Sequence, residues 1–162
     1  MRQQGFVKTL LFGLAAGVIA GLIVLGPGLR VAMRVVAIQD PFRASEFTIG
    51  GTMFIIIFLG VMIGGTLGIP GAIAARYLHR FAAVAIMTVL GMGILMADSE
   101  IVAEFFELGG GPWVNIPMFS VVFVAYSASV VWLVERLTRR VALYGAESRG
   151  EDIVQASVGG SL

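Results

Sequence analysis

Four long stretches without a charged side chain dominate this sequence. They cover residues 9–29, 47–75, 81–97 and 108–134. A helix needs about 20 apolar residues to cross the hydrocarbon core of a bilayer, and each run reaches or approaches that length. The runs lack the period-two alternation of a barrel strand, and a helix satisfies all its backbone groups internally. The sequence therefore predicts an all-α integral membrane protein, a four-transmembrane-helix bundle.

Composition supports lipid as the solvent of this chain. Of its 162 residues, 58% are hydrophobic and only 13% are charged, whereas soluble domains carry roughly 25% charged residues. The last residues, 144–162, are rich in Gly, Ser and acidic side chains and poor in large apolar ones. We therefore expect one membrane domain over 1–143 and a flexible cytoplasmic tail over 144–162.

The distribution of Lys and Arg predicts the orientation. If the chain crosses four times, seven basic residues share the side of the termini: Arg2, Lys8, Arg76, Arg80, Arg136, Arg139 and Arg140. The opposite side has three: Arg30, Arg34 and Arg43. Trp113 and Trp132 bracket the fourth span, where aromatic belts occur. Because positive loops stay inside, the sequence predicts a plasma (inner) membrane protein with cytoplasmic N- and C-termini.

Glycines at spacing four mark two of the predicted spans. Gly13, Gly17 and Gly21 form one stripe, and the other comprises Gly60, Gly64 and Gly68. Spacing of four places them on one helix face, where another backbone can approach closely. Two interpretations follow. The stripes face each other within one chain, or at least one of them faces a partner, either a second copy or another membrane subunit.

Polar residues outside the spans cluster on the predicted outer side. Residues 27–39 predict an interfacial helix after the first span, with Arg30 and Arg34 one turn apart. In the last connection, Glu100, Glu104 and Glu107 share a predicted helix face. The guanidinium and carboxylate groups either pair internally and hold the outer loops together, or form a site for a headgroup, a cation or a small polar ligand.

The sequence offers little chemistry. It has no cysteine and a single histidine, His79, and no catalytic or phosphate-binding motif, so we predict no catalytic residue, no metal site and no cofactor. No interleaved basic and aromatic surface points to nucleic acid. Ser120, Ser127 and Thr88 lie within spans, where hydroxyl groups bond neighbouring helices or, less often, line a pore.

These observations favour a small multi-pass protein that acts by helix packing, with membrane lipid and either other subunits or further copies of itself as partners. In this role it is an accessory or scaffold subunit. The alternative is a small oligomeric channel or facilitator for an ion or small solute. A channel predicts a continuous polar lumen, and an enzyme predicts a pocket joining the Arg30 and Glu100 regions.

Overall fold

The protein is helical throughout the part of the chain described by this computed structural model, which is residues 2–39, 49–97 and 111–159. Three of its helices are long and apolar enough to cross a membrane: Phe6–Val36, Gly50–Tyr77 and Pro112–Val141. A fourth apolar helix, Arg80–Leu95, is shorter. The predicted all-α class is therefore confirmed for these residues.

The first helix runs unbroken through α1 (Arg2–Ala20), a π-helical segment η1 (Gly21–Leu25) and α2 (Gly26–Gln39). The sequence predicted a separate interfacial helix over 27–39, but α2 directly continues the first span. Pro27 would be expected to end this helix. It has no N–H for the carbonyl of Ile23, and in a regular α-helix its ring would clash with that carbonyl. A wider π turn relieves this conflict without ending the helix.

The second helix has the same construction. It consists of α3 (Ile49–Phe58), the π-helical η2 (Leu59–Ile63) and α4 (Gly64–Tyr77). Pro70 lies inside α4 without ending it. The N–H of Gly64 points back to the carbonyl of Leu59, which is the five-residue spacing of a π-helix.

The third predicted span, 81–97, corresponds to α5 (Arg80–Leu95), which has 16 residues. At a rise of about 1.5 Å per residue it measures about 24 Å, less than the roughly 30 Å of a hydrocarbon core. The last helix, α7 (Pro112–Gly159), has 48 residues. Three full-length candidates and one shorter helix therefore stand where the sequence predicted four spans.

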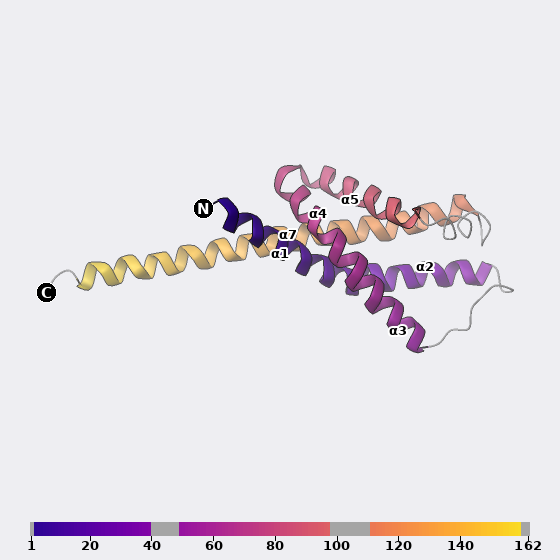
Figure 1. The fold of residues 1–162 in the computed structure, drawn as a ribbon, viewed down its shortest axis with the longest axis horizontal. Helices are drawn as coiled ribbons and strands as arrows, with labels where there is room; N and C mark the ends of the chain where they lie inside the picture. The colour runs from indigo at the N-terminus through magenta and orange to yellow at the C-terminus, as the bar shows by residue number, and fades with distance from the viewer. Residues whose placement is uncertain (1, 40–48, 98–110, 160–162) are drawn as a thin grey trace.

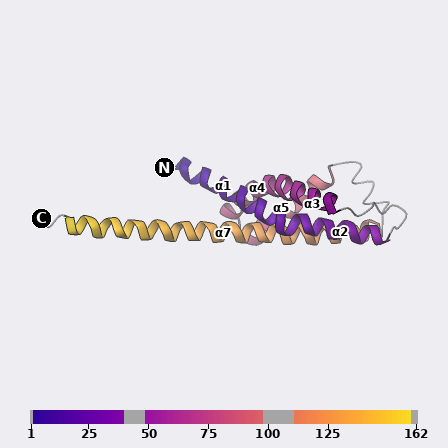
Figure 2. The same cartoon turned by 90° about the horizontal axis from the view of Figure 1, so that it is seen from below.

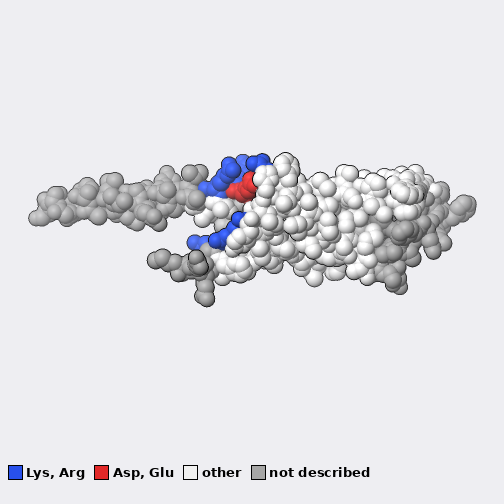
Figure 3. Space-filling model, turned by 90° about the horizontal axis from the view of Figure 1, so that it is seen from above, with Lys and Arg blue, Asp and Glu red and all other residues white. Residues whose placement is uncertain are grey.

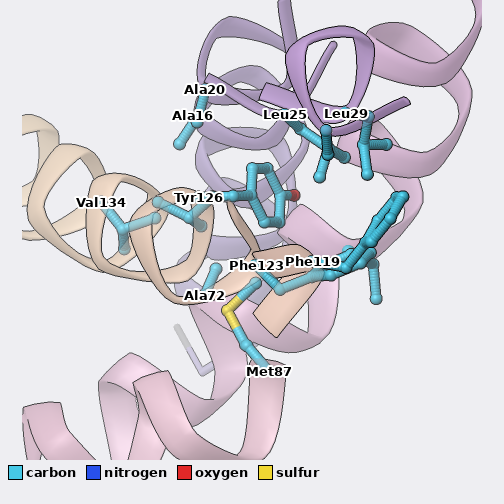
Figure 4. Close-up of a cluster of buried hydrophobic side chains, with 13 residues drawn as sticks. Ala16, Ala20, Leu25, Leu29, Ala72, Met87, Phe119, Phe123, Tyr126 and Val134 are labelled. Atoms are coloured by element: carbon cyan, nitrogen blue, oxygen red, sulfur yellow. The ribbon is translucent and has the colours of Figure 1, made fainter. Parts of the chain in front are cut away.

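In the bundle, α7 runs along the other helices and projects beyond them (Figures 1 and 2). The first helix lies against the second over most of its length, and α5 packs on α4 and α7. Apolar side chains recur every three or four residues on the inner face of α7, as expected for one buried stripe. The largest of them, Phe123 and Tyr126, are buried with Leu25, Leu29 and Met87 (Figure 4).

Beyond the bundle, α7 continues as a helix to Gly159 and projects away from the other helices (Figures 1 and 2). The sequence predicted a flexible tail over 144–162, and the structure differs in giving a helical path for 144–159. No proline interrupts this stretch. A helix of this length without packing is marginal in water, so the flexibility of the tail stays a prediction.

We expect amide hydrogen exchange to separate the two parts of α7. Amides of residues 144–159 should exchange about a hundredfold faster or more than those of residues 119–134, because residues such as Phe123, Tyr126 and Val130 hold the latter stretch in the bundle by burial. Exchange mass spectrometry on the detergent-solubilised protein measures this ratio. Equal protection along α7 would show that the projecting segment has stabilising contacts of its own.

Candidate functional site

The backbones of the first and second helices touch at their glycines. A Cβ atom on Gly17 would meet the carbonyl oxygen of Gly64 and lie 2.7 Å from the Cα of Gly68. A Cβ on Gly21 would meet the carbonyl oxygen of Gly60 and lie 3.0 Å from the Cα of Gly64. No side chain therefore fits between the helices at these turns.

The pairing extends one turn further and has a regular register. A Cβ on Gly13 would lie 2.6 Å from both the Cβ of Ala72 and the carbonyl oxygen of Gly68. Each step of four residues along the first helix is matched by a step of four back along the second, so the two helices are antiparallel. Of the two interpretations of the glycine stripes, this arrangement is the one within a single chain.

A fourth glycine shows what η1 does for this crossing. Gly26 follows Gly21 by five residues, which in a regular α-helix would turn it about 140° off the stripe. The N–H of Gly26 instead donates to the carbonyl of Gly21 across a π-helical turn. Gly26 thereby stays on the crossing face, where a Cβ would lie 2.8 Å from the carbonyl oxygen of Ile56. The π segment keeps the stripe in register as far as Gly26.

A hydrogen bond joins α7 to this crossing. The Tyr126 hydroxyl donates to the carbonyl oxygen of Gly64 at 2.6 Å, the same oxygen that a Cβ on Gly17 would meet. Tyr126 is fully buried, and Figure 4 shows its ring surrounded by labelled side chains of the first helix and by Ala72. Its hydroxyl, which would be costly to bury alone, is satisfied by this bond. Three helices therefore meet at one peptide group.

The other hydroxyl groups within the bundle bond to nearby partners. Thr88 donates to the carbonyl oxygen of Val84 at 2.8 Å and lies 3.4 Å from the hydroxyl oxygen of Ser127, which is fully buried. Ser129 donates to the carbonyl oxygen of Ala125 at 2.8 Å. In the described chain, these hydroxyl groups either link α5 to α7 or donate to a carbonyl of their own helix. Ser120 is half-buried on the same helix.

Charged side chains gather at the end of the bundle where α7 leaves it (Figure 3). A cavity of about 590 Å³ opens there. We call it the basic cleft, and its lining is Lys8, Thr9, Phe12, Ala72, Ala75, Arg76, Val134, Glu135, Thr138, Arg139 and Val141.

The basic cleft joins residues that are far apart in sequence. Lys8 comes from α1, Arg76 from α4 and Arg139 from α7. The Nη1 of Arg76 donates to the hydroxyl oxygen of Thr9 at 2.9 Å, which connects the ends of α4 and α1. Three cations and the carboxylate of Glu135 therefore line a space together with apolar side chains.

The polar cluster predicted for the outer side is only partly described. Arg30 is half-buried and Arg34 is exposed, both on α2. Glu100, Glu104 and Glu107 lie outside the described residues, so their pairing with the arginines stays a prediction.

Sequence reasoning missed two features of the site. It counted Lys8, Arg76 and Arg139 as topology markers and did not bring them together, because the cleft requires the packing of three helices. It also passed over Asn115, which is 1% exposed at the start of α7. The signal for Asn115 was present, since an amide inside an apolar run must be buried with polar partners or face water.

No group of three or more His, Cys, Asp or Glu residues that could hold a metal occurs in the described segments. No known family model, curated protein or solved structure matches the chain.

We expect the Gly17→Ala variant to lose stability, because its methyl group would overlap the backbone of the second helix. Overpacking of this kind costs about 1–3 kcal/mol or more. The matched control is Gly93→Ala, where a Cβ meets nothing within 4 Å and helix propensity predicts a change of at most about 1 kcal/mol in the stabilising direction. Unfolding in detergent followed by circular dichroism compares the two, and equal effects would contradict the backbone contact.

Removing the Tyr126 hydroxyl should weaken the attachment of α7. We expect Tyr126→Phe to cost about 0.5–1.5 kcal/mol, because it deletes one buried hydrogen bond and keeps the ring. The same unfolding measurement applies, and Phe123→Leu serves as a comparison that reduces ring packing without touching a hydrogen bond. A Tyr126→Phe variant as stable as the parent protein would show that the bond contributes nothing.

Proposed function

We propose that the chain is a multi-pass membrane protein that acts by packing, as a scaffold or accessory subunit in a larger membrane assembly. Two properties of the described bundle support this. Its helices are joined in the interior by backbone contacts and by hydrogen bonds from hydroxyl groups to backbone carbonyls. Much of its outer surface is apolar. A protein with these properties would act through contacts with neighbouring subunits in the bilayer.

The surface of α7 supports the membrane placement. Trp113 is 90% exposed, and Trp132 is also exposed with the guanidinium of Arg136 above its ring at 4.9 Å from the centroid. The two indole rings are about 28 Å apart along the helix at about 1.5 Å per residue, close to the thickness of a hydrocarbon core. The Trp132 level lies near the basic end, so we assign this end and both termini to the cytoplasmic side of the plasma membrane.

The observation that carries the packing role is the outer face of α5. One face of this short helix packs on α4 and α7 through the buried Ala83, Met87 and Gly91. The opposite face leaves Val89 70% exposed and Gly93 open. Association with other helices is one way in which a membrane accommodates a hydrophobic segment shorter than its thickness. We therefore propose this face as the contact with the neighbour.

A channel has less support. It would need a continuous polar lumen, whereas the described hydroxyls of Tyr126, Thr88 and Ser129 donate to backbone carbonyls of the bundle. An enzyme has less still, because the described residues bring together no nucleophile, base and orienting group.

Cross-linking through single cysteines tests the packing role. The natural chain has no cysteine, so Val89→Cys places one thiol on the outer face of α5. We expect a maleimide–benzophenone reagent, attached to this thiol and photolysed in native membranes, to give a discrete adduct, because benzophenone inserts into C–H bonds of a neighbour that has no cysteine. An adduct of twice the protein's mass identifies a second copy, and another discrete mass identifies a different subunit.

The control is Val121→Cys on α7, which replaces the same residue type at nearly equal exposure, 67% against 70%. We expect this variant to give far less adduct. Equal yields from the two positions, or no adduct from either, would contradict a specific contact through α5.

A further inference from the structure

The basic cleft has the composition of a site for an amphipathic anion. We propose that it binds the phosphate headgroup of an anionic phospholipid from the leaflet beside it.

The charge in the cleft suits a phosphate. Lys8, Arg76 and Arg139 supply three positive charges against the single carboxylate of Glu135, leaving a net charge of two positive. The guanidinium of an arginine matches phosphate oxygens with two parallel N–H groups, and a lysine adds a point charge. Between bilayer helices, basic pockets on the cytoplasmic side are a known mode of recognising phospholipid headgroups.

The cleft is also shaped before any ligand arrives. Arg76 donates a 2.9 Å hydrogen bond to the hydroxyl oxygen of Thr9, so one cation is positioned between α4 and α1. Glu135 and Arg139 lie one turn apart on α7 and stand on the same wall. Figure 3 shows Lys and Arg side chains gathered with acidic ones at this end of the bundle.

Apolar lining favours a lipid over free phosphate. Phe12, Ala72 and Val134 also line the cleft, and these side chains offer nothing to an inorganic anion. They suit the glycerol and upper acyl carbons of a phospholipid. The volume of about 590 Å³ lies within the range of roughly 300–1,000 Å³ typical of small-molecule sites.

Thermal unfolding of the full-length protein in neutral detergent tests the proposal. The probes are phosphatidylglycerol, phosphatidylcholine and inorganic phosphate, each titrated separately. We expect phosphatidylglycerol alone to raise the melting temperature in a saturable way. Stabilisation by inorganic phosphate with no advantage for the lipid would overturn the lipid assignment, and equal stabilisation by both lipids would overturn the anion site.

Variants with opposite expected signs sharpen the test. Arg139→Gln should raise the phosphatidylglycerol concentration at half saturation about fivefold, since each cation near a membrane surface contributes about that factor. Glu135→Gln should lower it, because it removes a negative charge from the lining. The matched control is Arg140→Gln, which makes the same charge change next to Arg139 at a residue outside the cleft. Equal weakening by Arg139→Gln and Arg140→Gln would show that only the overall charge matters and would overturn the site.

A second readout guards against misfolding. Each variant is first unfolded in phosphatidylcholine, and only those that match the parent protein there are compared in phosphatidylglycerol. Lys8→Gln replaces Arg139→Gln if the latter is unstable, with the same expected weakening. The proposal depends on the membrane placement but not on the packing role, so a failed cross-link at Val89 leaves it standing, and a failed lipid titration leaves the packing role standing.

Discussion

Direct backbone contact between the first two helices is the constraint on which the rest of the bundle depends. In lipid, apolar side chains gain little by meeting each other, so helices associate through close van der Waals contact and hydrogen bonds. Gly17 and Gly64 lie in this contact, since a Cβ on either would meet the other helix's backbone. The hydroxyl of Tyr126 on α7 bonds directly to this pair at Gly64.

The same contact explains two features that look unrelated. A π-helical turn at Gly21–Leu25 keeps Gly26 on the crossing face while the chain passes Pro27. The absence of a side chain at Gly64 leaves its carbonyl oxygen accessible. This oxygen accepts a hydrogen bond from the Tyr126 hydroxyl of α7. The glycines thus create both the close crossing and the polar point that attaches the longest helix.

In the described part of the molecule, the charged side chains lie towards its ends. The middle of the bundle uses its hydroxyls for internal bonds, whereas the end where α7 departs collects Lys8, Arg76 and Arg139 around one cleft. These two facts fit together physically. Charge is costly within hydrocarbon and inexpensive at a headgroup surface, so this distribution fits the proposed membrane placement.

The sequence by itself determined the helical class, the approximate limits of the long apolar helices and the faces on which the glycines lie. These follow from local rules, because hydrophobic length and spacing of four act within one helix. It did not determine that α2 continues the first helix, because the π turn that absorbs Pro27 is stabilised by packing at Gly26. The third run, 81–97, corresponds closely to the 16 residues of α5, and the count of four spans stays a prediction. The pairing of the two stripes, the bond from Tyr126 to Gly64 and the basic cleft were decided only by the tertiary structure, because each joins residues from helices far apart in the chain.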